Sequence, residues 1–347
     1  MDLFDDQGPA PAPALTPRPR PSQSRIEAAV CAPDLIALGA ALPAGLHLGT
    51  SSWSFPGWRG LVWRGDHSES SLSRTGLTAY SGHPLLRCVS LDRSFYRPLT
   101  ASQYAAYAGQ VPDHFRFVVK APSLVCDALV RGKAGRGLQD NPAFLDPVPA
   151  AAEFVQPALD GLGPKIGALV FQLSPLPPAW LARLDEVLER LAAMLAALPA
   201  LQPVAPGAVV AVEVRNPEFL TPAFAAILKA AGATYCLGLH PRMPPVDEQL
   251  PMLRALWPAP LVCRWSLNGR HGAYGYEDAK GLYEPFDRLQ DPDPATRKTL
   301  ARVIAATTGA ALPVYITVNN KAEGSAPLSV LELARAVHEI GAPEPET

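Results

Sequence analysis

The chain lacks the features that mark several large classes of protein. Its five cysteines, Cys31, Cys88, Cys126, Cys236 and Cys263, are widely spaced and include no C-x-x-C pair, so we expect neither a disulfide framework nor a structural zinc site. No stretch reaches the roughly 18 apolar residues of a membrane span. The acidic amino terminus also lacks the basic and apolar regions of a secretory signal. These absences predict a soluble, cytoplasmic protein with reduced thiols and no membrane partner.

A strong excess of charge and the common nucleotide and hydrolase motifs are also missing. The 30 basic residues nearly balance 32 acidic ones, giving a formal charge of -2, so no overall field favours nucleic acid or an anionic membrane. The sequence contains no G-x-G-x-x-G after its first strand, no Walker loop, no H-E-x-x-H and no G-x-S-x-G. We therefore predict no bound cofactor, and the oligomeric state stays open.

Proline is abundant instead, with 39 residues among 347. Its clustering between residues 9 and 21 is typical of a polyproline-II or disordered segment, which buries too little surface to fold. We expect residues 1–44 to form a largely disordered Pro/Ala-rich leader and residues 45–343 to form one domain.

Eight short apolar runs in that domain alternate with helical patterns. They are residues 46–51, 86–92, 115–121, 167–173, 208–214, 233–239, 261–266 and 313–319. Most are continuously apolar, as in parallel strands that are covered on both faces. The clearest helix is expected at residues 178–195, where leucines form one stripe. Eight β-then-α units in about 300 residues predict an α/β fold, the (β/α)8 TIM barrel; a doubly wound sheet is the alternative.

A TIM barrel places functional groups at the carboxyl ends of its strands. Polar residues follow or end most of the runs, and among them we single out Trp53, Asp92, Lys120, Gln172, Glu213, Arg215, His240, Arg264, Asn319 and Asn320. Lys120 and Glu213 lie within apolar runs, where an ionised group is costly unless it is paired. They are the candidate catalytic residues, and a purely structural ion pair involving Glu213 is the alternative.

The pieces GTSSWSFPGW, SFYRPL, FRFVVKAP, ALVFQLSP, VAVEVRNPEFL and VYITVNNKAEGSAPLSVLELA occur in this order. Together they resemble the YecE-like family, domain of unknown function 72, over roughly residues 46–340. The resemblance implies a TIM barrel and a soluble bacterial protein, without an established reaction. The family's recurrent residues correspond to Trp53, Trp58, Phe95, Tyr96, Lys120, Gln172, Glu213, Arg215, Arg264, Tyr274, Tyr276, Asn319 and Asn320.

The chain departs from the family pattern at several positions. Ser90 and Asp92 stand where the family usually has Glu and Asn, LVCD replaces a Thr-His after the lysine of the third run, and Trp265 and Ser266 replace a His-Gly. The loss of two histidines and a carboxylate implies a divergent subgroup. It argues against a mechanism that needs a family histidine.

The predicted site combines carboxylates, cations and amides. With Glu213 as base, Lys120 as base or electrostatic group, and Arg215 and Arg264 as anion anchors, it suits acid–base chemistry on an anionic, oxygen-rich small molecule such as a phosphorylated sugar or nucleotide. Asp92, Tyr96, Gln172, Tyr274, Tyr276, Asn319 and Asn320 would contact that substrate. No metal is predicted, since the residues lack a ligand spacing; a hard cation bound by oxygens alone is the alternative.

Aromatic residues leave two further alternatives open. Trp53 and Trp58 would either stack on a substrate ring or plug the barrel mouth. The segment NGRHGAYGYED, residues 268–278, mixes cations with tyrosines, as single-stranded nucleic-acid sites do. A non-catalytic barrel that binds RNA, a nucleotide or a protein is therefore the alternative function.

Overall fold

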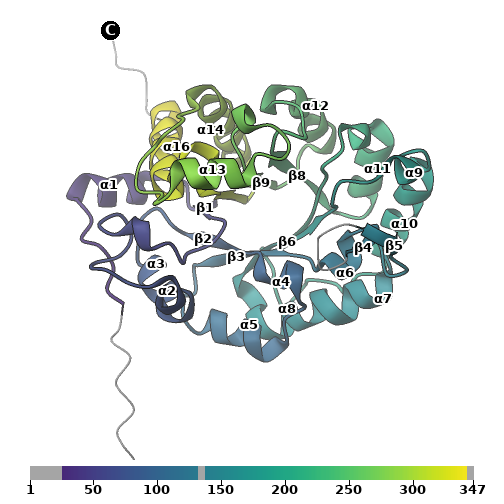
Figure 1. Ribbon diagram of the computed structural model, residues 1–347, viewed down its shortest axis with the longest axis horizontal. Helices are drawn as coiled ribbons and strands as arrows, with labels where there is room; N and C mark the ends of the chain where they lie inside the picture. Colours follow the sequence, from purple (N-terminus) through teal and green to yellow (C-terminus); the bar gives the residue numbers. More distant parts are fainter. Residues whose placement is uncertain (1–25, 132–136, 342–347) are drawn as a thin grey trace, which may run out of the picture.

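The computed structural model describes residues 26–131 and 137–341. Eight parallel strands close into a barrel in the order β1-β10-β9-β8-β7-β6-β3-β2, and helices surround it (Figure 1). The strands are β1 Leu46–Thr50, β2 Cys88–Leu91, β3 Arg116–Lys120, β6 Ile166–Gln172, β7 Val209–Glu213, β8 Thr234–Leu239, β9 Leu261–Trp265 and β10 Val314–Val318. Each overlaps one of the eight predicted runs, so the (β/α)8 prediction is confirmed.

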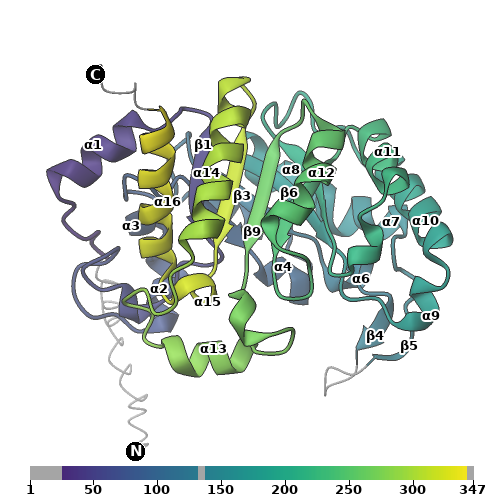
Figure 2. The same ribbon diagram turned by 90° about the horizontal axis from the view of Figure 1, so that it is seen from above.

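The helices that cover the barrel vary widely in length. They are α1 Pro33–Ala41, α2 Glu69–Thr75, α3 Leu77–Tyr80, α4 Arg93–Tyr96, α5 Ala101–Ala108, α6 Ser123–Cys126, α7 Pro147–Ala150, α8 Gln156–Leu162, α9 Pro178–Leu181, α10 Leu184–Ala196, α11 Pro222–Ala230, α12 Val246–Leu256, α13 Tyr276–Tyr283, α14 Pro294–Gly309, α15 Asn320–Glu323 and α16 Ala326–Gly341. A two-stranded antiparallel ribbon, β4 Leu129–Arg131 and β5 Gly137–Asp140, follows β3. Figure 2 shows α13 and this ribbon at one end of the molecule. Because both follow barrel strands, that end is the carboxyl-terminal face.

The first residues of the expected leader, 1–25, lie outside the described residues. Residues 26–44 are described, and they contain α1. Leu35 and Leu38 of α1 pack against the core, and Leu42 is buried. The described fold thus begins before residue 45, because these leucines give the segment an apolar face to bury.

The helix predicted over residues 178–195 is two helices, α9 and α10, which meet at Ala182 and Arg183. The backbone of Arg183 leaves the helical region, and its guanidinium lies 4.6 Å from the Trp180 ring centroid. Asp185 and Glu186 then occupy the first turn of α10, where carboxylates favour a helix amino terminus. Periodicity alone missed this break, since the leucine stripe continues across it.

The barrel interior changes from apolar to polar along the strand direction. Its lower part packs Cys88, Val118, Ala168, Val170, Ala211, Cys236, Val262 and Tyr315 together. Side chains two residues apart on a strand point to the same face. The next inward positions after these residues therefore include Ser90, Lys120, Gln172, Glu213, Gly238, Arg264 and Thr317. A polar layer lies directly above the apolar one, at the carboxyl-terminal mouth of the barrel.

Candidate functional site

Glu213 is the most deeply buried charged group of the polar layer. It has no exposed surface, and its two carboxylate oxygens face two guanidinium groups. Nη2 of Arg215 lies 2.5 Å from Oε1, and Nη1 of Arg264 lies 2.8 Å from Oε2. A Cβ at Gly238 would lie 3.2 Å from Oε1, so the missing side chain at that position makes room for the carboxylate. This arrangement favours the ion-pair interpretation of Glu213.

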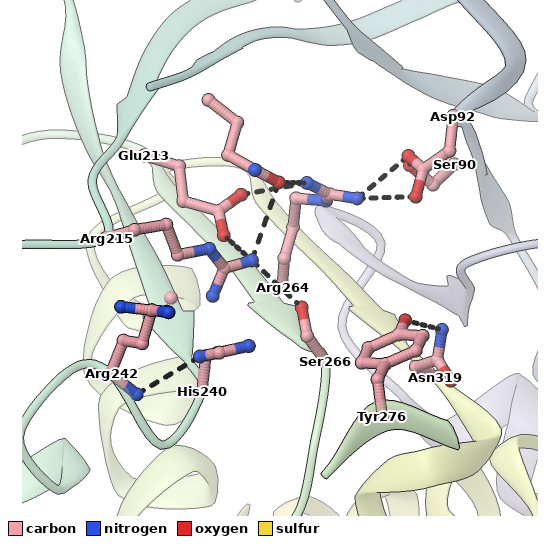
Figure 3. Close-up of polar contacts among 12 residues, drawn as sticks. Ser90, Asp92, Glu213, Arg215, His240, Arg242, Arg264, Ser266, Tyr276 and Asn319 are labelled. Carbon is pink, nitrogen blue, oxygen red and sulfur yellow. Dashed lines mark hydrogen bonds and ion pairs between the residues drawn. The ribbon is translucent and has the colours of Figure 1, made fainter. Parts of the chain in front are cut away.

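Arg264 connects the buried carboxylate to the mouth of the barrel. Its Nη2 donates to both oxygens of Asp92, at 2.8 and 2.6 Å, and its Nη1 donates to Gln172 Oε1 at 2.9 Å. Burial by itself lowers the pKa of Arg264, but Asp92 and Glu213 outweigh it and hold that pKa above the usual value. Figure 3 shows Arg264 between the two carboxylates. The guanidinium is therefore charged and fixed in direction.

Lys120 lies in the same layer without a carboxylate in contact. Its ammonium group is 3.5 Å from the ring centroid of Phe95, and in the part of the chain that the structure describes it forms no ion pair. Burial lowers the pKa of Lys120 to about 8, with Asp92 raising it and Arg264 lowering it further. An amine with this pKa exchanges protons readily near neutral pH.

A cavity of about 340 Å³ opens at the mouth, within the size range of small-ligand sites. Its lining residues come from six strand ends and the loops that follow them: Asp92, Tyr96, Lys120, Gln172, Pro175, Arg215, His240, Arg242, Arg264, Ser266, Ala273 and Tyr276. Glu213 is not among them, because it lies beneath the two arginines. Six of the predicted substrate-binding residues and Lys120 therefore share one cavity.

The rim of this cavity carries tyrosines and amides. Asn319 caps the start of α15 and donates from Nδ2 to the Tyr276 hydroxyl at 3.0 Å. Burial, followed by the nearby Asp92, raises the pKa of Tyr276 to about 12. Tyr96 and Tyr274 are 84% and 86% exposed, so their rings are free to contact a ligand. Tyr274 does not line the cavity itself; it packs against Arg242, whose guanidinium lies 4.6 Å from its ring centroid.

A larger hollow of about 530 Å³ lies between α12 and α14, near the amino ends of β8 and β9. Aliphatic side chains form most of its lining, and its charged members, Asp247, Arg254 and Arg302, lie on the two helices. Because active sites of TIM barrels lie at the carboxyl ends of the strands, we take the mouth as the candidate site.

A family profile described as "Protein of unknown function DUF72" matches residues 47–347. The chain belongs to the DUF72 family. This membership confirms the predicted resemblance, and the family description assigns no reaction or substrate. No curated protein matches the chain.

Two solved DUF72 structures resemble this barrel. One, from Thermotoga maritima, is 18% identical with a TM-score of 0.51, and the match covers 84% of this chain and 98% of that one. The other, from Enterococcus faecalis, is 17% identical with a TM-score of 0.50, covering 84% of this chain and 95% of that one. At these identities the similarity shows the fold alone.

In this DUF72 protein the predicted aromatic wall lies inside the fold. Trp53 is 7% exposed and donates from Nε1 to the carbonyl of Leu72 at 3.2 Å. Trp58 is fully buried and donates to Asn320 Oδ1 at 3.1 Å. Both indole N–H groups are thus bound within the protein, and neither tryptophan lines the cavity. The plug interpretation is favoured for both, and Asn320 is a buried partner of Trp58.

His240, Arg242 and Ser266 line the cavity although they were not among the predicted substrate contacts. The only sequence feature that marks them is their position after a strand. His240 follows β8 directly, Arg242 is two residues further, and Ser266 follows β9. Strand-end position singled out His240 in the sequence and could have found Ser266, whereas Arg242 lies further into its loop; polar residues at strand ends are too common to be specific.

The described ranges, 26–131 and 137–341, contain neither a membrane-spanning helix nor a metal-binding cluster. No helix there is long and apolar enough to cross a bilayer. No cluster of three or more His, Cys, Asp or Glu side chains there could hold a metal ion.

Proposed function

We propose that this barrel binds an anionic, oxygen-rich small molecule in its mouth and transfers a proton on it, with Lys120 as the acid–base group. The observation that carries the proposal is the convergence of four cationic side chains on one cavity: Lys120, Arg215, Arg242 and Arg264. They come from four different segments of the chain. A phosphorylated sugar or a nucleotide-like molecule has the matching charge.

The arginines supply the electrostatic part of the proposed mechanism. Arg264 is fixed by oxygen atoms of three residues, and Arg215 by Glu213, so their positive charges are oriented before a substrate arrives. Preoriented charge stabilises a developing oxyanion without reorganisation during the reaction. Glu213 then acts through the two arginines as a positioning residue, and does not itself touch the substrate.

Lys120 supplies the proton transfer. With a pKa of about 8, its amine is partly neutral under mildly alkaline conditions and accepts a proton; its ammonium form returns that proton. The Phe95 ring on one side and the cavity on the other limit where the amine points. Asp92, which is 34% exposed at its side chain, lies close enough to tune this pKa.

The proposal is tested first by ligand stabilisation. Wild-type protein is heated with sugar phosphates, nucleotides and organic acids; a ligand at a hundred times its Kd adds about 2.7 kcal/mol to the free energy of unfolding. Ligands that stabilise the protein are then incubated with it in deuterated water, and loss of ligand C–H signals is followed by NMR. Wild type should exchange a ligand proton, and Lys120→Gln should not.

Lys229→Gln is the matched control, because Lys229 is an exposed lysine of α11, outside the mouth. It should exchange the ligand proton at the wild-type rate. Equal exchange by Lys120→Gln and wild type would refute the role of Lys120. If a ligand stabilises the protein but neither wild type nor Lys120→Gln exchanges a ligand proton, the barrel binds the ligand without catalysing proton transfer.

A second candidate function, recognition of single-stranded nucleic acid, rests on the exposed rings of Tyr96 and Tyr274 and on Arg242, which packs against Tyr274. Base–aromatic stacking contributes about 1–3 kcal/mol per base. This function predicts RNA binding that weakens steeply with salt and is lost in Tyr96→Ala. Salt-independent or absent binding in a fluorescence anisotropy series would exclude it.

A further inference from the structure

Three hydrogen-bond donors on one side of the mouth have no acceptor among the residues that the structure describes. The first is Nη1 of Arg215, which is buried and has no hydrogen-bond partner among the described residues. The other terminal nitrogen of this guanidinium, Nη2, lies near Glu213, Gln172 and Ser266. An unpaired buried donor costs free energy, so an unpaired Nη1 on a residue that lines the cavity points to an acceptor from outside the chain.

The second donor is Nε2 of His240. Its other ring nitrogen, Nδ1, accepts the backbone N–H of Arg242 at 3.1 Å. In the neutral ring the proton therefore resides on Nε2, which has no hydrogen-bond partner in the described part of the chain. Burial, followed by the charge of Arg215, lowers the pKa of His240 to about 4; Glu213 opposes this and Arg242 adds to it. At neutral pH the ring is an uncharged donor.

The third donor is the guanidinium of Arg242. It lines the cavity, and no carboxylate of the described residues forms an ion pair with it. The ring centroid of the exposed Tyr274 lies 4.6 Å from this guanidinium. Figure 3 shows His240 and Arg242 together below Arg215, away from Asp92. The three donors come from the end of β7 and the loop between β8 and α12.

The charges of the whole site identify the acceptor. Four cationic groups line the cavity, while Asp92 and the underlying Glu213 supply two negative charges, so an excess of two positive charges is left. A carboxylate would neutralise one of them, whereas a phosphate monoester carries nearly two negative charges at neutral pH and three acceptor oxygens. Arginine donors in particular suit phosphate oxygens.

We infer that Arg215, His240 and Arg242 form a subsite for the phosphoryl group of a phosphate monoester. The inference rests on the proposed function, because it assigns one end of the proposed anionic substrate to this side of the mouth. The remainder of the molecule then extends toward Lys120 and Asp92, where the proposed proton transfer takes place.

Isothermal titration calorimetry of the full chain tests the subsite with three probes: inorganic phosphate, glycerol 3-phosphate and glycerate. Wild type should bind both phosphate compounds. Its affinity for glycerate, which carries a carboxylate in place of the phosphate, should be at least about tenfold lower. Arg242→Gln and His240→Phe should each lower the affinity for glycerol 3-phosphate by about tenfold. Both residues are half-buried, without a buried ion pair to break, so the variants should fold.

Two further variants separate the donor role from a structural one. His240→Gln places an amide N–H near the position of Nε2 and should restore much of the affinity that His240→Phe loses. Arg254→Gln removes an exposed arginine of α12 that lies outside the mouth, and it should bind all probes as wild type does.

The outcomes distinguish this inference from the proposed function. Phosphate binding that is unchanged in Arg242→Gln and His240→Phe would overturn the subsite and leave the proposed function standing. If wild type binds glycerate or other organic acids but neither phosphate probe, the subsite is also overturned and the proposed function also stands. If no anion of any class binds to wild type, both ideas are refuted.

Discussion

The ion pair between Arg264 and Asp92, in which Nη2 donates to both carboxylate oxygens, spans the mouth of the barrel. Arg264 lies near the end of β9 and Asp92 follows β2, and β10 and β1 lie between these strands in the closed sheet. The same guanidinium reaches Glu213 on β7, across β8. One side chain thus joins three separated strands, which explains how residues 172 positions apart in sequence define one site.

The pKa of Lys120 depends on Asp92, which raises it against the effect of burial. We expect an amine pKa of about 8 in wild type and a lower value in Asp92→Asn, because that variant removes the negative charge. The pH dependence of lysine acylation, followed by mass spectrometry of the Lys120 peptide, measures both. Lys229 provides an internal control with an exposed amine. An unchanged or higher pKa in Asp92→Asn would contradict the prediction.

Removing the charge of Glu213 should destabilise the fold strongly. Glu213→Gln leaves Arg215 and Arg264 without their buried partner, and breaking a buried ion pair in this way costs about 3–5 kcal/mol. Urea unfolding of wild type and variant gives the difference. Glu186→Gln is the control, since Glu186 pairs with Arg183 in solvent, where such pairs contribute about 0–1 kcal/mol. If Glu213→Gln lowers the free energy of unfolding as little as Glu186→Gln does, Glu213 is not a structural ion-pair partner of the two arginines.

Gly57 is required by a close approach of two backbones. A Cβ at this position would lie 1.8 Å from the carbonyl oxygen of Pro285, so Gly57→Ala must push the loop after β1 away from the segment after α13. Such overpacking costs about 1–3 kcal/mol. Gly281→Ala in α13 meets no atom within 4 Å, and alanine favours the helix by about 1 kcal/mol, so it should stabilise the protein slightly. In urea unfolding, we expect the free energy of unfolding to fall in Gly57→Ala and to rise slightly in Gly281→Ala.

Acid should destabilise the protein partly through His83. Burial lowers the pKa of His83 to about 4, and its Nδ1 accepts the N–H of Leu85 at 3.2 Å. The unfolded chain, with an ordinary histidine pKa of 6.5, binds this proton more readily than the folded one does. The stability that neutral His83 contributes is therefore complete above pH 6.5 and is lost as the pH falls toward 4.

His83→Asn tests this contribution, since its amide oxygen can accept the Leu85 N–H and cannot be protonated in this range. The free energy of unfolding of the variant should fall less steeply between pH 6.5 and 4 than that of wild type. His338→Asn, which changes an exposed histidine of α16, should follow the wild-type curve. Parallel curves for wild type and His83→Asn would refute the assignment.

The eight strands could be predicted because each is a continuous apolar run that the closed barrel buries on both faces. The polar layer was also visible: Lys120, Glu213 and Arg264 each stand two residues after an inward apolar position, and strand periodicity carries that relation. The break between α9 and α10 was missed, because a leucine stripe reports burial and does not report the local backbone turn at Arg183.

The sequence by itself determined the barrel, the family and the set of polar groups at the mouth, because strand pattern and strand-end position are local properties. Only the tertiary structure decided which groups pair. It buried Glu213 beneath two arginines, placed Trp53 and Trp58 inside the fold, and left Lys120, His240 and Arg242 on the cavity wall. These outcomes depend on distances across the closed barrel, between residues far apart in sequence, and no local pattern encodes such distances.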